Sequence, residues 1–152
     1  MDIHIPESVR AEHHELQELL ARATRAGGRT EEAAKEVARL LHAHFLKEEA
    51  YALPPLGLLG LLASGAATPG MAAVLALTDK LEAELPTMLE EHRAIVGALV
   101  ALVDAAGAEG KPEVARFAEK LILHAQTEEQ VMYPAALLVG RYLKAVLPAN
   151  AC

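Results

Sequence analysis

Apolar residues recur along most of the chain at the spacing of amphipathic helices, and no alternating strand pattern is present. The pattern predicts four long helices: from about Ser8 to Ala26, from about Thr30 to Tyr51, from just after Pro69 to about Ala106, and from Pro112 onward. The glycines of Gly27-Gly28 and of the segment GAEG at 107–110 are expected stop signals.

Two prolines fall inside the predicted helices. Pro86 is expected to kink or break the third helix, and Pro134 to kink the fourth, because proline lacks the backbone N–H that continues the helical ladder. The short links make sequential helices antiparallel neighbours. We therefore predict an all-α fold, an up-down-up-down four-helix bundle, formed by a single domain over residues 1–152.

The segment from Ala50 to Thr78 contains no charged residue and is long enough to cross a bilayer. Seven prolines and glycines divide it into short pieces, so we predict no membrane span. Its sequence LGLLGLLA indicates a short extra apolar helix between the second and third long helices. The segment is also a candidate surface for homo-oligomer formation.

The charge and cysteine content exclude several classes of protein. The formal net charge is −7 and no Lys/Arg cluster stands out, which argues against nucleic-acid binding. The single cysteine, Cys152, allows no disulfide within the chain, which fits a reducing compartment. The first residues, MDIHIPESVRAE, lack the pattern of a secretory signal, and a cytoplasmic location is expected.

One phrase occurs twice, as HFLKEEAYALP at 44–54 and as HAQTEEQVMYP at 124–134, and both copies read H-x-x-x-E-E-x-x-x-x-P. In each copy the histidine and the first glutamate, His44 with Glu48 and His124 with Glu128, lie on the apolar face of the predicted helix. Burying these groups without partners costs several kcal/mol, so something must compensate them.

The other two helices each supply a further histidine, His13 and His92, which precede His44 and His124 by 31 and 32 residues. This arrangement indicates a duplicated helical hairpin whose pseudo-twofold packing gathers four histidines and two carboxylates in one bundle. Imidazole and carboxylate ligands suit iron, manganese or zinc. Two carboxylates between two histidine pairs describe a dinuclear site, which helical bundles are known to hold.

For His44, Glu48, His124 and Glu128, the alternative is a polar network inside the bundle that holds no metal. The other polar residues receive less specific interpretations. His14 competes with His13, but the Glu-His register shared with Glu91-His92 favours His13. The remaining expectations are surface positions for His4 and His42, solvated or second-layer acids at Glu49 and Glu129, core packing or a hydrogen bond to a bound oxygen species for Tyr51 and Tyr133, and core filling by Met71, Met88 and Met132.

The segments EHHELQELL, HFLKEEAYALP, EEHRAI and HAQTEEQVMYP span residues 12–134 and resemble the hemerythrin-like, HHE cation-binding family. The resemblance implies a four-helix bundle with a non-haem di-iron site. By motif position, it implies that His13 and His44 bind one iron and that His92 and His124 bind the other. Glu48 and Glu128 would bridge the two ions, and zinc or manganese are candidate substitutes.

The sequence departs from the oxygen-carrying hemerythrins at the third helix. Those proteins have a second histidine one turn from the first, whereas Met88 and Val96 lie one turn either side of His92. Simple oxygen transport is therefore disfavoured, and we expect a di-iron protein that binds or reduces O2, peroxide or NO, with enzymatic turnover left open. The alternatives are a metal- or oxygen-sensing or iron-handling module that acts through a partner, and a structural zinc site.

Overall fold

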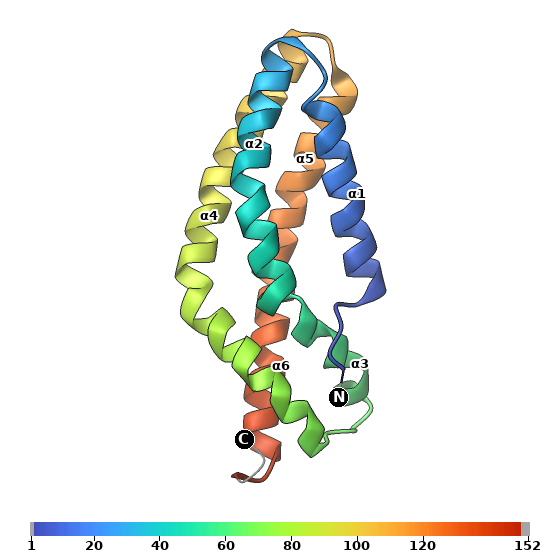
Figure 1. Ribbon diagram of the computed structural model, residues 1–152, viewed down its shortest axis with the longest axis vertical. Coiled ribbons are helices and arrows are strands. Elements are labelled where there is room, and N and C mark those ends of the chain that lie inside the picture. The colour runs from blue at the N-terminus through green and yellow to red at the C-terminus, as the bar shows by residue number, and fades with distance from the viewer. Residues whose placement is uncertain (1, 150–152) are drawn as a thin grey trace.

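The computed structural model describes residues 2–149, and within this range all regular elements are helical. They are, in chain order, α1 (Glu7–Ala23), α2 (Gly28–Lys47), η1 (Glu48–Ala52), η2 (Pro54–Leu58), α3 (Leu59–Ala63), η3 (Pro69–Val74), α4 (Leu75–Ala108), α5 (Pro112–Thr127), η4 (Glu128–Met132) and α6 (Tyr133–Val146). In Figure 1 the long helical segments run along one axis in alternating directions. They are α1, α2, α4 and the continuous segment formed by α5, η4 and α6. The predicted all-α, up-down-up-down four-helix bundle is confirmed.

The glycine stop signals lie where the sequence placed them. Gly27 and Gly28 have φ angles of 80° and 61°, and Gly110 has a φ of 68°, a region that glycine occupies without steric cost. The chain reverses direction at both places, between α1 and α2 and between α4 and α5 (Figure 1).

The predicted helix starts at Ser8 and Thr30 are each displaced. Ser8 lies inside α1 and Thr30 lies inside α2, and neither caps its helix. Instead, Glu109 at the end of α4 accepts hydrogen bonds from the Thr30 backbone N–H at 2.8 Å and from its hydroxyl at 2.5 Å. A carboxylate from another helix therefore satisfies the free donors at the start of α2.

The uncharged segment folds as two short 3-10 helices, η2 and η3, on either side of α3. The expected short apolar helix is thus present. A side chain at Gly57 would collide with the backbone carbonyl of His4, so this glycine permits the N-terminal segment to cross η2 closely. No helix in the described range of 2–149 combines the length and apolar character needed to cross a membrane.

Pro86 lies within α4, which runs continuously from Leu75 to Ala108. The helix changes direction in its lower part in Figure 1, so the proline bends the helix without ending it.

Both copies of the repeated motif contain the same local change from α-helix to π-helix. The π segments are Glu48–Ala52 and Glu128–Met132, and each ends shortly before a proline, Pro54 or Pro134. In each copy the residue before the proline donates its backbone N–H five residues back, to Glu48 or Glu128. The proline, which cannot donate and crowds the carbonyl four residues earlier, accounts for this wider turn.

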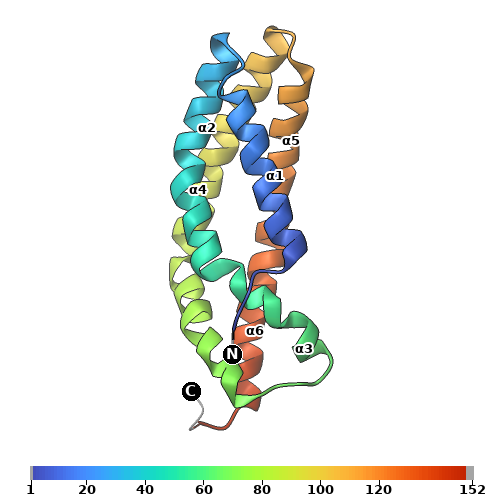
Figure 2. The ribbon, with the colours of Figure 1, turned by 45° about the vertical axis from the view of Figure 1, so that its right-hand side comes forward.

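The candidate polar residues lie between two apolar layers. One layer fills the half of the bundle near the two glycine turns, with Leu20, Leu41, Leu99 and Leu121 among its members. The other surrounds Leu53, Leu81, Met88 and Tyr133 near the proline ends of the motifs. Figure 2 shows α1, α2, α4 and α5 side by side in the upper part of the molecule, with α3 and α6 in the lower part. A buried polar cluster between two such layers needs internal partners, because burial removes most of the water that would otherwise hydrate it.

Candidate metal centre

The six side chains singled out from the sequence lie together in the interior. His13 is on α1, His44 on α2, His92 on α4 and His124 on α5, while Glu48 and Glu128 are the first residues of the two π segments. None is more than 4% exposed. Their ligand atoms form two groups, each lying within 4.8 Å: His44, Glu48, His92 and Glu128, and His13, His124 and Glu128.

The nearest histidines lie across the two hairpins, whereas motif position implied pairs within each hairpin. The ring centroids of His44 and His92 are 4.5 Å apart, and those of His13 and His124 are 5.2 Å apart. The first pair joins α2 to α4, and the second joins α1 to α5. Each pair therefore combines one histidine from each copy of the motif.

Glu48 lies between the two histidine pairs. Its Oε1 is 2.9 Å from His44 Nε2 and 3.6 Å from His92 Nε2, whereas its Oε2 is 3.3 Å from His13 Nε2. The two oxygens of one carboxylate thus face different pairs.

Glu128 repeats this arrangement from the other copy of the motif. Its Oε1 is 3.5 Å from His92 Nε2, while its Oε2 is 3.4 Å from His13 Nε2 and 3.2 Å from His124 Nε2. In both carboxylates, therefore, Oε1 faces the His44–His92 pair and Oε2 faces the His13–His124 pair.

The outer nitrogen of each histidine faces a further carboxylate. The distances from Nδ1 to the carboxylate oxygen are 3.0 Å for His44 and Glu91, 2.9 Å for His92 and Glu129, 2.6 Å for His124 and Glu12, and 3.7 Å for His13 and Glu49. A carboxylate opposite Nδ1 favours the tautomer with its proton there. When the imidazole is neutral, as a metal ligand must be, the lone pair of Nε2 then faces the centre of the cluster.

Charge balance in the cluster depends on the buried carboxylates. Burial by itself lowers the pKa of His92, but its interactions with the nearby Glu128 and Glu48 carboxylates outweigh it and raise the pKa to about 10. The pKa of His124 rises to about 9 in the same way, through Glu128 and then Glu12. Burial alone would raise the pKa of Glu128, but its interactions with the His124, His13 and His92 rings lower it well below its usual value.

Several buried polar atoms in the cluster have no hydrogen-bond partner among the described residues. These are Oε2 of Glu48, Nδ1 of His13 and Nε2 of His124. His124 Nε2 does lie 3.2 Å from Glu128 Oε2, but the contact lacks hydrogen-bond geometry. Two of these atoms, Glu48 Oε2 and His124 Nε2, point inward, which is what a bound cation requires, and nitrogen and carboxylate oxygen suit iron, zinc or manganese. The residues present therefore fit a metal ion.

Tyr133 is part of the same cluster, although sequence reasoning gave it core packing as its main role. Its hydroxyl donates to Glu48 Oε1 at 2.5 Å and lies 3.1 Å from His92 Nε2 and 3.4 Å from His44 Nε2. Burial and the nearby charges of Glu48 and Glu128 raise the pKa of this phenol. The signal that could have found it is its position directly before Pro134, at the end of the π segment.

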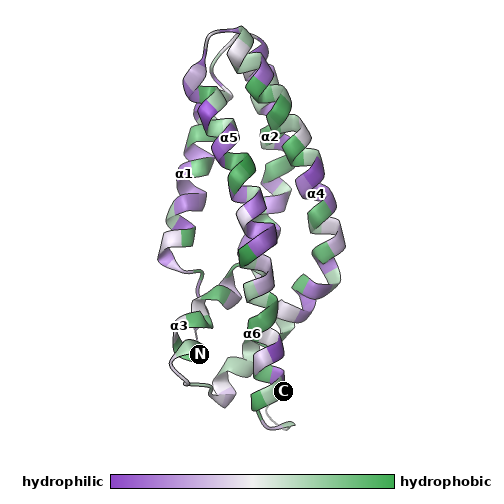
Figure 3. Cartoon of the chain, turned by 180° about the vertical axis from the view of Figure 1, so that it is seen from behind, coloured by the Kyte–Doolittle hydropathy of each residue, from purple (hydrophilic) through white to green (hydrophobic). Residues whose placement is uncertain are grey.

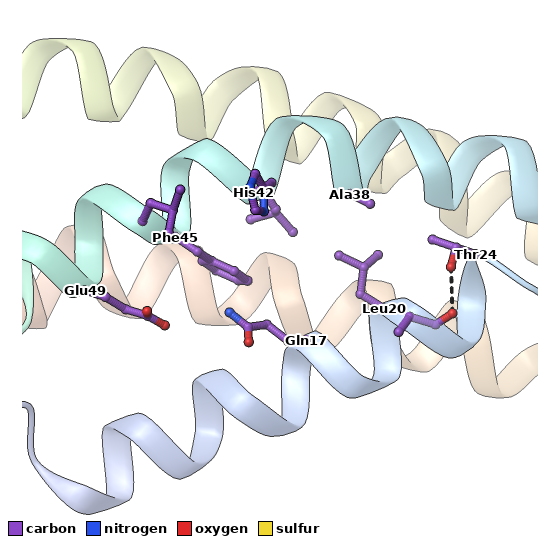
Figure 4. Close-up of a pocket in the computed structure, with 10 residues that line it drawn as sticks. Gln17, Leu20, Thr24, Ala38, His42, Phe45 and Glu49 are labelled. Atoms are coloured by element: carbon purple, nitrogen blue, oxygen red, sulfur yellow. Dashed lines mark hydrogen bonds between the residues drawn. The ribbon is translucent and has the colours of Figure 1, made fainter.

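The larger surface cavities lie beside the cluster, and one of them has His124 in its lining. Figure 4 shows a groove of about 450 Å³ between α1 and α2, with Leu20, Phe45 and the exposed His42 on its walls. The Phe45 ring separates this groove from the cluster and packs 4.7 Å from the His13 ring. A second groove of about 450 Å³ lies between α1 and α5 and reaches one edge of His124.

A smaller cavity of about 110 Å³ reaches the cluster at His13. Its other walls are Ile5, Arg10, Glu49 and Leu53. Most small-molecule pockets are roughly 300–1,000 Å³, so this cavity suits a molecule of only a few atoms.

A helical bundle that buries two carboxylates between two pairs of histidines has the fold and the site expected of a metal-binding domain. The family model described as the hemerythrin HHE cation-binding domain matches residues 4–136. The chain belongs to this family. Comparisons with curated proteins and with solved structures gave no significant match.

Proposed function

We propose that this chain holds two iron ions and binds or reduces a small oxidant such as O2, peroxide or NO. In this proposal His44 and His92 bind one ion and His13 and His124 bind the other. Glu48 and Glu128 bridge the two ions. Zinc or manganese could occupy the same positions, because they accept the same donor atoms.

The proposal rests on the two oxygens of each carboxylate, which face different histidine pairs. Oε1 of Glu48 and Oε1 of Glu128 face the His44–His92 pair, while both Oε2 atoms face His13. A single cation would need only one oxygen from each carboxylate. Two equivalent bridges between two nitrogen pairs are the donor arrangement of a dinuclear centre.

The surrounding residues support a small ligand. The cavity beside His13 is about 110 Å³, and Ile5 and Leu53 contribute apolar walls. Such a space admits a diatomic molecule or a peroxide and excludes a bulky organic substrate. A bound iron pair supplies up to two electrons to such an oxidant, and an external reductant must restore them. The outer carboxylates hold the histidine rings in place while the ligand binds.

Iron loading followed by peroxide consumption tests the proposal. The wild-type chain is expected to hold two irons and to consume peroxide when a reductant is supplied. Glu48→Ala and Glu128→Ala should each lose metal from both positions, because each removes a bridge. A chain that binds zinc only, and shows no absorption band from an oxo or peroxide ligand on iron, would contradict the proposal and favour a structural metal.

Two exposed histidines provide matched controls. The side chain of His14 is 72% exposed and lies beside Glu18, and His42 lies in the open groove of Figure 4. His14→Ala and His42→Ala should leave the metal content unchanged. Loss of metal in His14→Ala but not in His13→Ala would show that the assignment on α1 is wrong.

A second candidate function, sensing or iron handling through a partner, has one observation in its favour. Leu59, Leu61 and Leu138 are 40%, 46% and 63% exposed, and a shallow apolar cavity of about 330 Å³ lies between α3 and α6. Hydrophobic residues occur along both elements in Figure 3. The α3 part of this surface belongs to the segment 50–78, the candidate surface for homo-oligomer formation. Metal binding without peroxide turnover, combined with a metal-dependent change in association state, would favour this function.

A further inference from the structure

We infer that the Tyr133 oxygen is a third protein donor to the cation held by His44 and His92, and that the two halves of the centre are therefore chemically different. This inference rests on the proposed function. It answers the question raised by Met88 and Val96, which leave the third helix without a second histidine.

The position of the Tyr133 hydroxyl carries the inference. Tyr133 is 1% exposed, and its oxygen lies 3.1 Å from His92 Nε2, 3.4 Å from His44 Nε2 and 2.5 Å from Glu48 Oε1. Three of the atoms assigned to one cation thus surround one phenol oxygen. An ordinary packing role would place this oxygen where it could find a partner outside the cluster.

The π segment explains why Tyr133 reaches the centre. Each α-helical residue turns the chain by about 100°, so the fifth residue after Glu128 would point well away from it. In the π segment, the Tyr133 N–H bonds to the Glu128 carbonyl five residues back, and Tyr133 returns to the face that carries Glu128. Pro134 makes this arrangement favourable because it disrupts the α-helical ladder at that point.

The other copy of the motif has the same backbone but a different side chain. Leu53 holds the position of Tyr133, directly before Pro54, and its N–H bonds to the Glu48 carbonyl at 2.9 Å. Leu53 is fully buried and lines the small cavity beside His13. The half of the centre near His44 and His92 is therefore closed by a phenol. The half near His13 and His124 has no such donor and adjoins the cavity, so the small ligand binds there.

When Tyr133 binds the cation, the only other chemical change is the loss of its phenol proton. The O–H bond of Tyr133 breaks, an oxygen lone pair forms the bond to the cation, and the proton is released to solvent. No electron is transferred in this step. Tyrosine oxygen is a known ligand of iron in proteins, and a hard oxygen donor suits ferric iron.

The optical spectrum of ferric protein tests the inference. A phenolate bound to ferric iron has a visible charge-transfer band, and resonance Raman excitation in that band gives tyrosine ring modes. The wild-type chain should show both signals. Tyr133→Phe, which keeps the ring that fills the core, should lose both signals. Tyr51→Phe is the matched control, because Tyr51 is also buried but its hydroxyl has no hydrogen-bond partner among the described residues, and it should keep both signals.

The outcomes separate this inference from the proposed function. A wild-type chain with two irons and peroxide turnover but no phenolate signal would overturn the tyrosine ligand alone. Retention of the signal in Tyr133→Phe would overturn it as well. A wild-type chain that binds no metal would overturn both. Zinc titration of the wild-type chain gives a second test without any variant, since the ultraviolet difference spectrum should show one tyrosinate forming as metal binds.

Discussion

Each histidine of the cluster is held from outside by a carboxylate, but the four contacts are not equally close. In the two copies of the motif, Glu49 and Glu129 are equivalent residues, and they face His13 and His92. The distance is 3.7 Å for Glu49 and 2.9 Å for Glu129. Only the second contact has hydrogen-bond geometry. The two copies of the motif therefore differ in how closely the outer carboxylate contacts a histidine.

Removing the Glu129 carboxylate should weaken metal binding more than removing the Glu49 carboxylate. We expect Glu129→Ala to lower the affinity for the cation near His92 by about 10- to 100-fold, the usual effect of losing an outer carboxylate. Glu49→Ala should have a smaller effect because its contact with His13 is longer. Competition with a chelator of known affinity measures both variants. An equal loss in the two would show that the outer carboxylates act only through their charge.

At the scale of elements, the start of α2 depends on a carboxylate from the end of α4. Hydrogen bonds from the Thr30 hydroxyl and from the backbone N–H groups of Thr30 and Arg29 lower the pKa of Glu109 to about 2. A carboxyl group whose pKa is lower in the folded chain stabilises the fold above its unfolded pKa. That stabilisation is lost as the pH falls toward the folded pKa.

Glu109→Gln should therefore reduce stability in a pH-dependent way. At neutral pH the variant is expected to unfold at a lower urea concentration than the wild type. The difference should shrink as the pH falls below about 4.5, the ordinary value, toward 2. Glu119→Gln, at an exposed position on α5, serves as the control and should unfold like the wild type. A constant difference at every pH would mean that Glu109 acts through packing alone.

The sequence predicted the long helices and six buried polar residues because both depend on helical period. The π segments were not predicted. Each adds a single residue to one helical turn, so the spacing of apolar residues still looks like that of an α-helix. Tyr133 was assigned mainly to the core for the same reason. On an α-helix it would face away from Glu128, and only the wider turn before Pro134 brings it back.

At the scale of the whole molecule, the histidine pairs join the two halves of the chain that carry the repeated motif. His44 and His92 join α2 to α4, and His13 and His124 join α1 to α5. The sequence could not give this pairing, because it records which helices follow one another and not which helices face one another across the bundle. Motif order suggested pairs within each hairpin. The packed structure places the nearest histidines in different hairpins.

In the proposed centre, bound metal would tie all four long helices together. A cation held by groups from several helices binds the folded chain and not the unfolded one, so its binding free energy adds to the stability of the fold. The two open grooves beside α1 indicate that this helix, which carries His13, is the least enclosed of the four. We therefore expect bound metal to add to the attachment of α1, which otherwise packs through Leu16, Leu20 and Ala23.

The most direct measurement is anomalous diffraction at the iron edge from crystals of the iron-loaded chain. The account predicts two peaks inside the bundle, one beside His44 and His92 and the other beside His13 and His124. Glu48 and Glu128 should lie between the peaks with one oxygen toward each. A single peak, or none within the cluster in crystals of a chain supplied with excess iron, would contradict the dinuclear centre.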